Sequence, residues 1–400
     1  MMRWLLPEAF SDVLPTEARQ LEELRRHLLD LARSYGYELV QPPLVEHLDS
    51  LAIGRGSDLD LRTFKLIDQL SGRTLGLRPD MTPQVARIDA QRLDRQGVVR
   101  LAYCGSVLHA RPGNLGSTRE PIQVGAEIYG HEGLEADLEV VDLMLASLRR
   151  GGVQTVRVDL CHLGLVRALL ALDARLDEET LFPLFQRKDL PGLSVVLGQL
   201  PRLAPEVHSA LLALPTLYGS DPADVLSRAR TELPKVAAVQ QALDELERLV
   251  QSHLLARRVG ASLTIDLGDL RGYRYHTGIT FAAYVSGRSG SIARGGRYDN
   301  IGAVFGRGRP ATGFSLELRE LAALAALAQT VKPSSAIRAP WQDDPALASA
   351  IVGLRTAGEI VVQMVGSTTE QEEYRFDREL VFRDGAWEVQ RLIGPPPSNE

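Results

Sequence analysis

The strongest constraint on this chain comes from two neighbouring glycine-containing motifs that are joined to strand-like stretches. The first motif, Arg271 to Gly278, lies between Ser262–Leu267 and Ile279–Tyr284. Both flanking stretches alternate with a period of two and are rich in β-branched and aromatic residues, which is the pattern of β-strands. The second motif, Arg294 to Asp299, follows soon afterwards. Adjacent strands therefore carry arginine, tyrosine, histidine and glycine at their ends.

This combination of residues is suited to binding a small ligand. Glycine lets the backbone approach a ligand closely or adopt a positive φ, and a fixed arginine can hold a carboxylate or phosphate through two hydrogen bonds. The motifs predict a polar pocket on a sheet for a small anionic or zwitterionic molecule. From the residues alone, the alternative is a pair of β-hairpins whose aromatic side chains only pack.

Composition limits the remaining possibilities. A length of 400 residues suggests two or three domains, and a net charge of −6 argues weakly against an extended nucleic-acid surface. No apolar run approaches the roughly 20 residues of a membrane span, so we expect a cytoplasmic protein without a membrane contact. Cys104 and Cys161 lack metal-ligand spacing, and the histidines form no His-Glu-x-x-His pattern. We therefore expect no metal and no cofactor.

The order of patterns along the chain predicts its organisation. A helix is expected over Glu17–Ser34, a hairpin over 63–78 and a helix over 82–93, followed by further strands, a long leucine-rich helical block, and a return to strands at Gly260. Near the C-terminus we expect a helix and short strands at 359–365, 379–382 and 387–392. The predicted domains are a core at 1–160 and 260–330, a helical insertion at 161–259, a linker at 331–343, a small α/β module at 344–393 and a disordered tail at 394–400.

Taken in order, these pieces resemble the core of a class II aminoacyl-tRNA synthetase, and specifically that of the histidyl-tRNA synthetases, over about residues 7 to 330. The resemblance rests on six colinear segments, which are Pro7–Pro15, Gly36–Pro43 (motif 1), Leu77–Thr82, Gln123–Glu127 (the end of motif 2), Arg271–Gly278 and Gly295–Asp299. It implies an α+β fold, with an antiparallel sheet core flanked by helices, a helical insertion and a short α/β remnant of the family's anticodon-binding domain.

The resemblance also implies a pocket for histidine. Asp80, Gln123 and Thr82 would accept hydrogen bonds from the ligand ammonium. Glu127 would accept from the imidazole N–H, which favours histidine over an apolar isostere, and Arg271 would hold the carboxylate. Two tyrosines would line the ring, and two glycines would allow close backbone approach. The predicted histidine-binding residues are Asp80, Thr82, Gln123, Glu127, Arg271, Tyr275, His276, Gly295, Gly296 and Tyr298.

Two of these positions depart from the synthetase pattern. Asp80 stands where the family has glutamate, which shortens the side chain by one methylene. His276 replaces the second tyrosine of a Tyr-Tyr pair, which changes a hydrogen-bond partner of the ligand ring. Both changes leave polar groups in the pocket.

The segments that would bind the nucleotide in a synthetase depart further from the family pattern. The first arginine of motif 2 falls on Leu108 or His109, and the glycine of motif 3 that admits the nucleotide has become Glu317. Glu320 stands where the phosphate-binding arginine is expected. Loss of one charge-stabilising donor typically costs on the order of 3 kcal/mol in a transition state, so no catalytic residues are expected. Because phosphate contacts need Lys or Arg and acidic residues cluster at the C-terminus, tRNA binding is not expected.

An amino-acid pocket without its nucleotide site is the pattern of a sensor. The chain resembles the regulatory subunits of ATP phosphoribosyltransferase, a family of histidyl-tRNA synthetase paralogues in histidine biosynthesis. That likeness lies in Gly272–Gly278, Arg119–Pro121 and the shortened C-terminus. It implies a non-catalytic subunit that binds histidine for feedback control and is required by a short-form catalytic subunit. Motif 1 implies a homodimer within a hetero-oligomer.

Two other functions stay open from the sequence. One is an active histidyl-tRNA synthetase with degenerate motifs, which would exchange pyrophosphate on ATP when histidine is present. The other is a free-standing histidine-sensing module that acts on a different protein, which would be found without a phosphoribosyltransferase partner.

Overall fold

The computed structural model describes residues 5–51, 61–112, 117–258, 260–270, 276–288, 290–328, 333–366 and 374–392. The chain divides into two compact units. The core unit consists of Met1–Ser11 and Glu23–Ala325, and the C-terminal unit consists of Asp12–Glu22 and Ala326–Glu400. Each unit is described here by itself.

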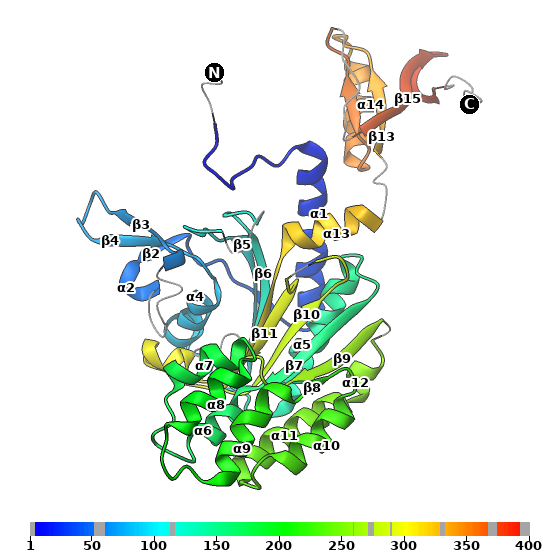
Figure 1. Ribbon diagram of the computed structural model, residues 1–400. Helices are drawn as coiled ribbons and strands as arrows, with labels where there is room; N and C mark the ends of the chain where they lie inside the picture. The colour runs from blue at the N-terminus through cyan, green and yellow to red at the C-terminus, as the bar shows by residue number, and fades with distance from the viewer. Residues whose placement is uncertain are drawn as a thin grey trace. The chain divides into compact units, whose positions relative to one another are not determined.

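The core unit is built on a nine-stranded sheet (Figure 1). Its strands, in spatial order, are β1 (Glu38–Leu39), β5 (Val99–Ser106), β6 (Ile122–Tyr129), β12 (Ala311–Glu317), β11 (Ala293–Arg297), β10 (Ile279–Tyr284), β7 (Val156–His162), β9 (Ala261–Asp266) and β8 (Tyr218–Gly219). The strands from β5 to β7 are all antiparallel. Parallel pairs, β1 with β5 and β7 with β9, lie outside them. The predicted α+β class with an antiparallel core is confirmed.

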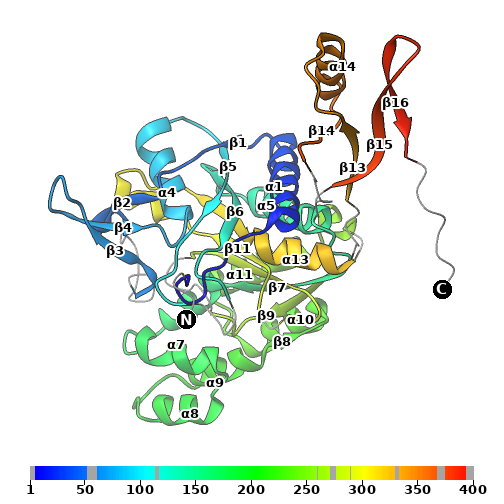
Figure 2. The same cartoon turned by 90° about the horizontal axis from the view of Figure 1, so that it is seen from above.

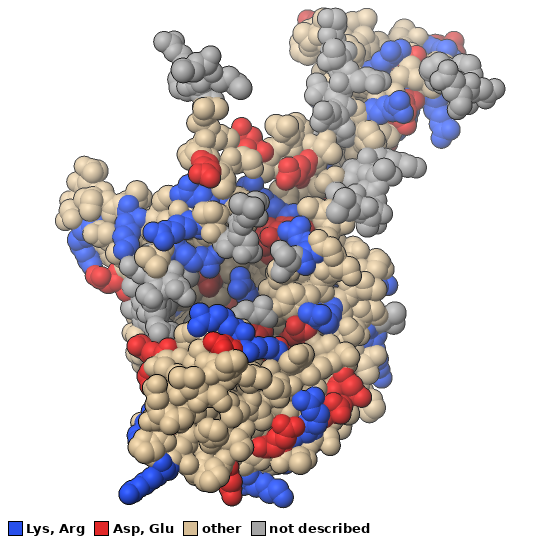
Figure 3. Space-filling model, in the orientation of Figure 1, with Lys and Arg blue, Asp and Glu red and all other residues tan. Residues whose placement is uncertain are grey.

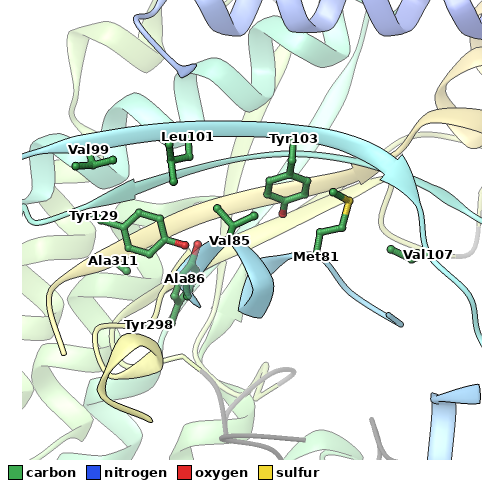
Figure 4. Packing of buried hydrophobic residues seen from close by; sticks show 10 residues of the cluster. All are labelled: Met81, Val85, Ala86, Val99, Leu101, Tyr103, Val107, Tyr129, Tyr298 and Ala311. Carbon is green, nitrogen blue, oxygen red and sulfur yellow. The ribbon is translucent and has the colours of Figure 1, made fainter. Parts of the chain in front are cut away.

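Helices cover both faces of this sheet. The 17-residue helix α5 (Leu134–Arg150) lies on the face that carries Arg100 and Ile128, and its Glu139 forms an ion pair with Arg100 at 2.7 Å. On the opposite face, α4 (Thr82–Arg87) packs beneath β5 through Val85 and Ala86, next to Tyr103 (Figure 4). Because side chains alternate along a strand, Tyr103 and Glu127 share the face that α4 covers.

The helix α1 (Pro15–Ser34) ends as predicted, where Gly36 adopts a φ of +85°. The last helical residue is Ser34. The residue that follows it, Tyr35, takes part in a polar network. Its hydroxyl donates to Asp142 at 2.7 Å, and Arg258 donates to the same carboxylate at 2.6 Å. This network ties the end of α1 to α5.

Residues between β7 and β9 are mainly helical, as predicted. Their helices are α6 (Leu163–Leu170), α7 (Glu178–Gln186), α8 (Leu190–Gly198), α9 (Pro205–Ala213), α10 (Pro222–Glu232), α11 (Ala237–Val250) and α12 (His253–Ala256). Their leucines form a buried apolar interior, and Asp177, Asp189 and Asp221 cap helix N-termini. The helices gather in one region of the core unit (Figure 1). Within the described part of this segment, the short strand β8 and the 3-10 turn at Leu214–Thr216 were not expected.

Beside the large sheet lies a small three-stranded one, in the order β2-β4-β3. The predicted hairpin is present as β3 (Phe64–Ile67) and β4 (Thr74–Leu77), and β2 (Val45–His47) pairs with β4, next to the short α2 (Leu48–Leu51). The predicted helix over 82–93 is partly wrong, because the α-helix ends at Arg87. Residues Ile88–Leu93 continue it as a π-helical segment that closes at Asp94, whose φ is +44°.

The C-terminal unit holds a second sheet, in the order β14-β13-β15-β16. Its strands are β13 (Ser334–Ala339), β14 (Val361–Gln363), β15 (Tyr374–Arg383) and β16 (Ala386–Arg391). Helix α14 (Pro345–Thr356) packs on it through Leu347 and Ile351, against Ile337 and Leu380 (Figure 2). The predicted linker at 331–343 therefore contains an interior strand, and the predicted strand at 379–382 is the end of a ten-residue strand. The expected tail lies outside the described residues.

None of the helices in the described ranges is both long enough and apolar enough to cross a membrane.

Candidate amino-acid-binding site

The site is organised by strand register. Glu127 on β6 pairs with Gly313 on β12, Gly313 pairs with Gly296 on β11, and Gly296 pairs with Thr280 on β10. These four positions form one row across the sheet and face the same side. Because Gly313 has no Cβ atom, the Glu127 carboxyl group and the Tyr298 hydroxyl can lie directly over it.

Asp80, Thr82 and Gln123 are brought together by hydrogen bonds. The Gln123 side chain donates from Nε2 to Asp80 Oδ1 at 2.9 Å and accepts from the Met81 N–H at 2.8 Å. Asp80 Oδ1 also accepts from the Thr82 N–H at 3.0 Å, which turns the chain into α4. Nearby, the buried Arg78 donates to the carbonyls of Pro42 and Ser106. The polar groups predicted to receive an ammonium are therefore held in one fixed cluster.

Tyr103 links this cluster to Glu127. Its hydroxyl lies 3.0 Å from Thr82 Oγ1 and donates to Glu127 Oε1 at 3.0 Å. The ring crosses above Gly125, where a Cβ atom would lie only 2.4 Å from the hydroxyl. In Figure 4 the hydroxyl points from β5 toward Met81 and Val85. Sequence reasoning missed Tyr103, since only the pairing of β5 with β6 brings it to this site.

Glu127 is buried, with 1% of its surface exposed. Its second oxygen, Oε2, has no hydrogen-bond partner among the described residues. Burial raises the pKa of Glu127 well above its ordinary value, and the hydrogen bond from Tyr103 opposes that rise. A buried carboxyl oxygen with no partner is costly, so this oxygen is a candidate contact for a ligand.

Tyr298 and His276 border the same space. Their ring centroids lie 5.9 Å apart in an edge-to-face arrangement. A Cβ atom on Gly313 would lie 2.3 Å from the Tyr298 hydroxyl and 2.2 Å from Glu127 Oε2. The carboxyl and phenol groups therefore converge over Gly313, a residue that the sequence did not single out because its role depends on the strand on either side.

The two predicted glycines of β11 serve close strand packing. A Cβ atom on Gly296 would meet the Ile279 carbonyl at 2.6 Å and the His276 ring at 2.8 Å. A Cβ atom on Gly295 would meet the Gly313 carbonyl at 2.1 Å and the Phe281 ring at 2.7 Å. Gly296 faces the site, whereas Gly295 faces the Phe281 side of the sheet.

Arg297 and Asp299 anchor the end of the histidine-containing loop, just before β10. Arg297 forms a buried ion pair with Asp137 of α5 at 2.6 Å, and a second, at 3.3 Å, with Asp299. Asp299 in turn accepts from the Thr277 hydroxyl at 2.9 Å, and the Thr277 N–H donates to the Arg297 carbonyl at 2.7 Å. These contacts fix Thr277, which follows His276 directly.

A small cavity of about 90 Å³ adjoins His276 on the same side of the sheet. Its polar lining comes from three neighbouring strands and their loops, namely Asp159, Cys161, Asp269, Thr280, Ser291 and Arg294. Of the ten predicted residues, Arg271 and Tyr275 lie outside the described residues. The other eight lie on the strands or segments that surround the Glu127 row.

The opposite end of the site, where a synthetase holds its nucleotide, is built differently. Glu317 ends β12, and its carboxylate accepts from the N–H groups of Ile122 at 2.9 Å, Arg319 at 3.2 Å and Glu320 at 2.6 Å. It thereby caps α13 (Leu318–Ala328) and joins it to β6. Burial raises the pKa of Glu317, and the three backbone donors oppose the rise. This side chain fills the position of the family's glycine.

His109, one of the two positions on which the motif 2 arginine can fall, is held as a neutral ring. Its Nε2 lies 3.0 Å from the Pro79 carbonyl, which can only accept, so Nε2 carries the proton. Arg62 lies 3.3 Å from Nδ1 and donates to it. Burial, and then the charge of Arg62, lowers the pKa of His109. It cannot supply a cation at neutral pH.

Two further charged residues on this side are paired within the protein. Arg119 lies between the rings of Phe10 and Phe64, at 5.0 Å and 4.9 Å, and donates to the His109 carbonyl. Glu320 forms an ion pair with Arg288 at 3.1 Å. A carboxylate at this position would repel a phosphate. The ion pair with Arg288 weakens that repulsion, although the family's arginine is still missing there.

Lysine and arginine side chains are unevenly distributed over the surface of the core unit. On the face shown in Figure 3, Lys and Arg side chains gather on the core unit beside the helical insertion. Such a surface attracts small anions and zwitterions with an exposed carboxylate. It contrasts with the net charge of −6 for the whole chain.

The sheet and the groups on its open face define a class II aminoacyl-tRNA synthetase-like protein of the histidyl type, and a family model for histidyl-tRNA synthetase matches residues 9–321. A second model, for the C-terminal domain of the ATP phosphoribosyltransferase subunit HisZ, matches residues 334–390. The chain belongs to the family of ATP phosphoribosyltransferase regulatory subunits.

Whole-chain relatives carry that name. The regulatory subunit of Cupriavidus necator is 57% identical over 389 residues, which cover 96% of this chain and 98% of the relative. The one from Janthinobacterium sp. is 55% identical over 395 residues, or 98% and 100% of the two chains. The family resemblance inferred from the motifs is thereby confirmed.

Solved structures agree on the fold. A Bacillus halodurans protein described as an ATP phosphoribosyltransferase regulatory subunit/histidyl-tRNA synthetase aligns with a TM-score of 0.79 and 26% identity, over 94% of this chain and 98% of its own. Histidyl-tRNA synthetase from Nostoc sp. aligns with a TM-score of 0.72 over 92% of this chain and 88% of its own. At 20% identity, the second likeness concerns the fold alone.

Proposed function

We propose that this regulatory subunit performs no catalysis itself, binds free L-histidine at the Glu127 site, and passes the binding signal to a short-form catalytic ATP phosphoribosyltransferase. The catalytic subunit would need this chain for activity and would be inhibited when histidine is bound. Both would act in the cytoplasm, with this chain as a homodimer inside the hetero-oligomer.

The observation that carries the proposal is the contrast between the two ends of one sheet face. At one end, the buried Glu127 places Oε2 over Gly313, beside the Tyr298 hydroxyl, and this oxygen has no hydrogen-bond partner among the described residues. At the other end, the Glu317 carboxylate is occupied by three backbone donors of its own chain. A ligand with a ring N–H suits the first end, and a triphosphate does not suit the second.

The geometry also suits the rest of a histidine molecule. The carboxylate of Asp80 and the amide of Gln123 form an acceptor cluster near Tyr103 and Thr82, which is the chemistry that an ammonium group needs. We assign the ligand carboxylate to Arg271 and one side of the ring to Tyr275, both from the sequence motif. His276 and Tyr298 would complete the ring pocket.

Feedback by histidine requires a difference in affinity between two arrangements of the complex. A coupling free energy of about 1–3 kcal/mol is typical of such regulation. The anchored Thr277, fixed by Asp299 and Arg297, provides a rigid route from the histidine loop to α5. In that case histidine would change the affinity of this chain for the catalytic subunit by a certain factor. Binding of the catalytic subunit would change the affinity of this chain for histidine by the same factor.

Calorimetric titration tests the first part of the proposal. Histidine should bind the full-length chain, or its complex with a short-form catalytic subunit, and should inhibit phosphoribosyl transfer only when this chain is present. Absence of binding to both would remove the sensor role. Histidine-dependent pyrophosphate exchange on ATP at synthetase rates would instead identify an active synthetase. Isolation of the chain from a lysate without any phosphoribosyltransferase would favour a free-standing sensor.

A further inference from the structure

Glu127 stands in surroundings that favour the neutral form of its carboxyl group. It is 1% exposed, Oε1 accepts from Tyr103 at 3.0 Å, and Oε2 has no partner among the described residues. A Cβ atom on Gly313 would lie 2.2 Å from Oε2 and 2.3 Å from the Tyr298 hydroxyl, which places this oxygen over the glycine row and beside the Tyr298 phenol. The oxygen on the side of the sheet that carries His276 and Tyr298 is thus the one without a hydrogen-bond donor among the described residues.

The charged and titratable groups around Glu127 include no Lys or Arg in the described part of the chain. They are Asp80 from the segment before α4, Tyr103 from β5, Tyr298 after β11, His276 from the segment before β10, Tyr129 from β6 itself and Tyr37 from the segment before β1. The one charged group among those that act on the carboxyl is the carboxylate of Asp80. Burial and a neighbouring carboxylate both disfavour a second negative charge. Burial also raises the pKa of Tyr103, so its hydroxyl stays a donor.

We propose that Glu127 is protonated at Oε2 in the ligand-free protein and transfers this proton to the imidazole ring of the incoming histidine. The inference rests on the proposed histidine site. It further states which ligands that site prefers, namely those with an azole side chain that is basic enough to accept a proton. Glu127 is then the specificity-determining residue, and Tyr103 positions it.

The transfer balances within the bound pair. The O–H bond at Oε2 breaks, an N–H bond forms on the ring nitrogen that lacked one, and the products are a carboxylate and an imidazolium ion. The new carboxylate keeps its bond from Tyr103 and gains a charge-assisted hydrogen bond from the ring. A neutral imidazole therefore binds without exchanging a proton with solvent. An imidazolium, which predominates below about pH 6.5, must release one.

Two measurements on the full-length protein test this. Histidine labelled with ¹⁵N in the ring and bound at about pH 8, where the free ring is neutral, should give the nitrogen signals of an imidazolium. Calorimetry at the same pH, in two buffers of different ionisation enthalpy, should give no buffer dependence, because the proton comes from the protein. Below about pH 6.5, one proton should be released and the affinity should fall about tenfold per pH unit.

The outcomes separate this inference from the function on which it rests. A bound ring that stays neutral at pH 8, or a proton taken up from the buffer, would overturn the transfer while leaving the histidine site intact. Failure of histidine to bind at all would remove the site itself. In E127Q, any histidine that binds should keep a neutral ring. If E127Q does not fold, the wild-type protein still decides, because a histidine analogue with a less basic 1,2,4-triazole ring should bind at least about tenfold more weakly. Equal affinity for the triazole would contradict the inference.

Discussion

The two ends of the open sheet face use carboxyl groups in opposite ways. Glu127 is buried on β6 and has one oxygen without a hydrogen-bond partner among the described residues, whereas Glu317, at the end of the neighbouring β12, accepts hydrogen bonds from three backbone N–H groups. The first can act on a ligand, and the second stabilises the local fold. The difference teaches that a carboxyl group indicates a binding site only when its acceptors are not already used by the protein.

The comparison is tested most strongly at Glu127. E127Q removes the acid but keeps the shape, so histidine affinity should fall by about 2–4 kcal/mol, which is roughly 30-fold or more. Titration calorimetry measures it. Thermal stability should be unchanged or higher, because the amide oxygen can still accept from Tyr103 and no ionisable group stays buried. An affinity within about threefold of wild type would place the ring elsewhere.

At Glu317 the expected effect is on stability. E317G restores the family's glycine but leaves the N–H groups of Ile122, Arg319 and Glu320 without their acceptor, which should cost about 2–3 kcal/mol in the free energy of unfolding. Urea denaturation measures this cost. The matched control E317Q keeps an acceptor oxygen and should lose less than half as much. A stable E317G variant that makes histidyl-adenylate would mean that one glycine restores the nucleotide site.

A smaller loss of histidine affinity is expected at Tyr103, which donates a hydrogen bond to Glu127. Y103F removes the hydroxyl between Thr82 and Glu127 but retains the ring that packs on α4. Histidine affinity should fall roughly tenfold, or about 1–1.5 kcal/mol, because Glu127 loses its positioning donor. The control Y129F alters a buried phenol on the same face and should leave affinity nearly unchanged. Equal losses in both variants would point to general packing.

Glu320 should show the smallest effect. Its ion pair with Arg288 involves side chains that are about one-third exposed, and such pairs contribute less than about 0.5 kcal/mol. E320Q should therefore unfold at nearly the wild-type urea concentration and bind histidine with the same affinity. A marked loss of histidine binding would show that the two ends of the face are coupled.

Much of the core could be predicted because its signals are local. The alternation in 262–267 and 279–284 gave β9 and β10, and Gly36 gave the end of α1. The hairpin at 63–78 was predicted from its own residues. By contrast, the linker predicted at 331–343 contains β13, an interior strand of the C-terminal sheet. Short apolar stretches such as Ala336–Ile337 do not reveal their strand partners.

The sequence alone determined the family and the order of the motifs, because these depend on residue identity and spacing along the chain, and it predicted the residues of the histidine site. Tertiary structure alone decided that Tyr103 reaches Glu127 across Gly125, that Gly313 lies between two site strands, and that Arg297 pairs with Asp137, which is 160 residues away. It also decided that Glu317 is a cap and His109 a neutral ring. The physical reason is that strand register and burial set which groups meet and which charges persist, and both arise from contacts between distant segments.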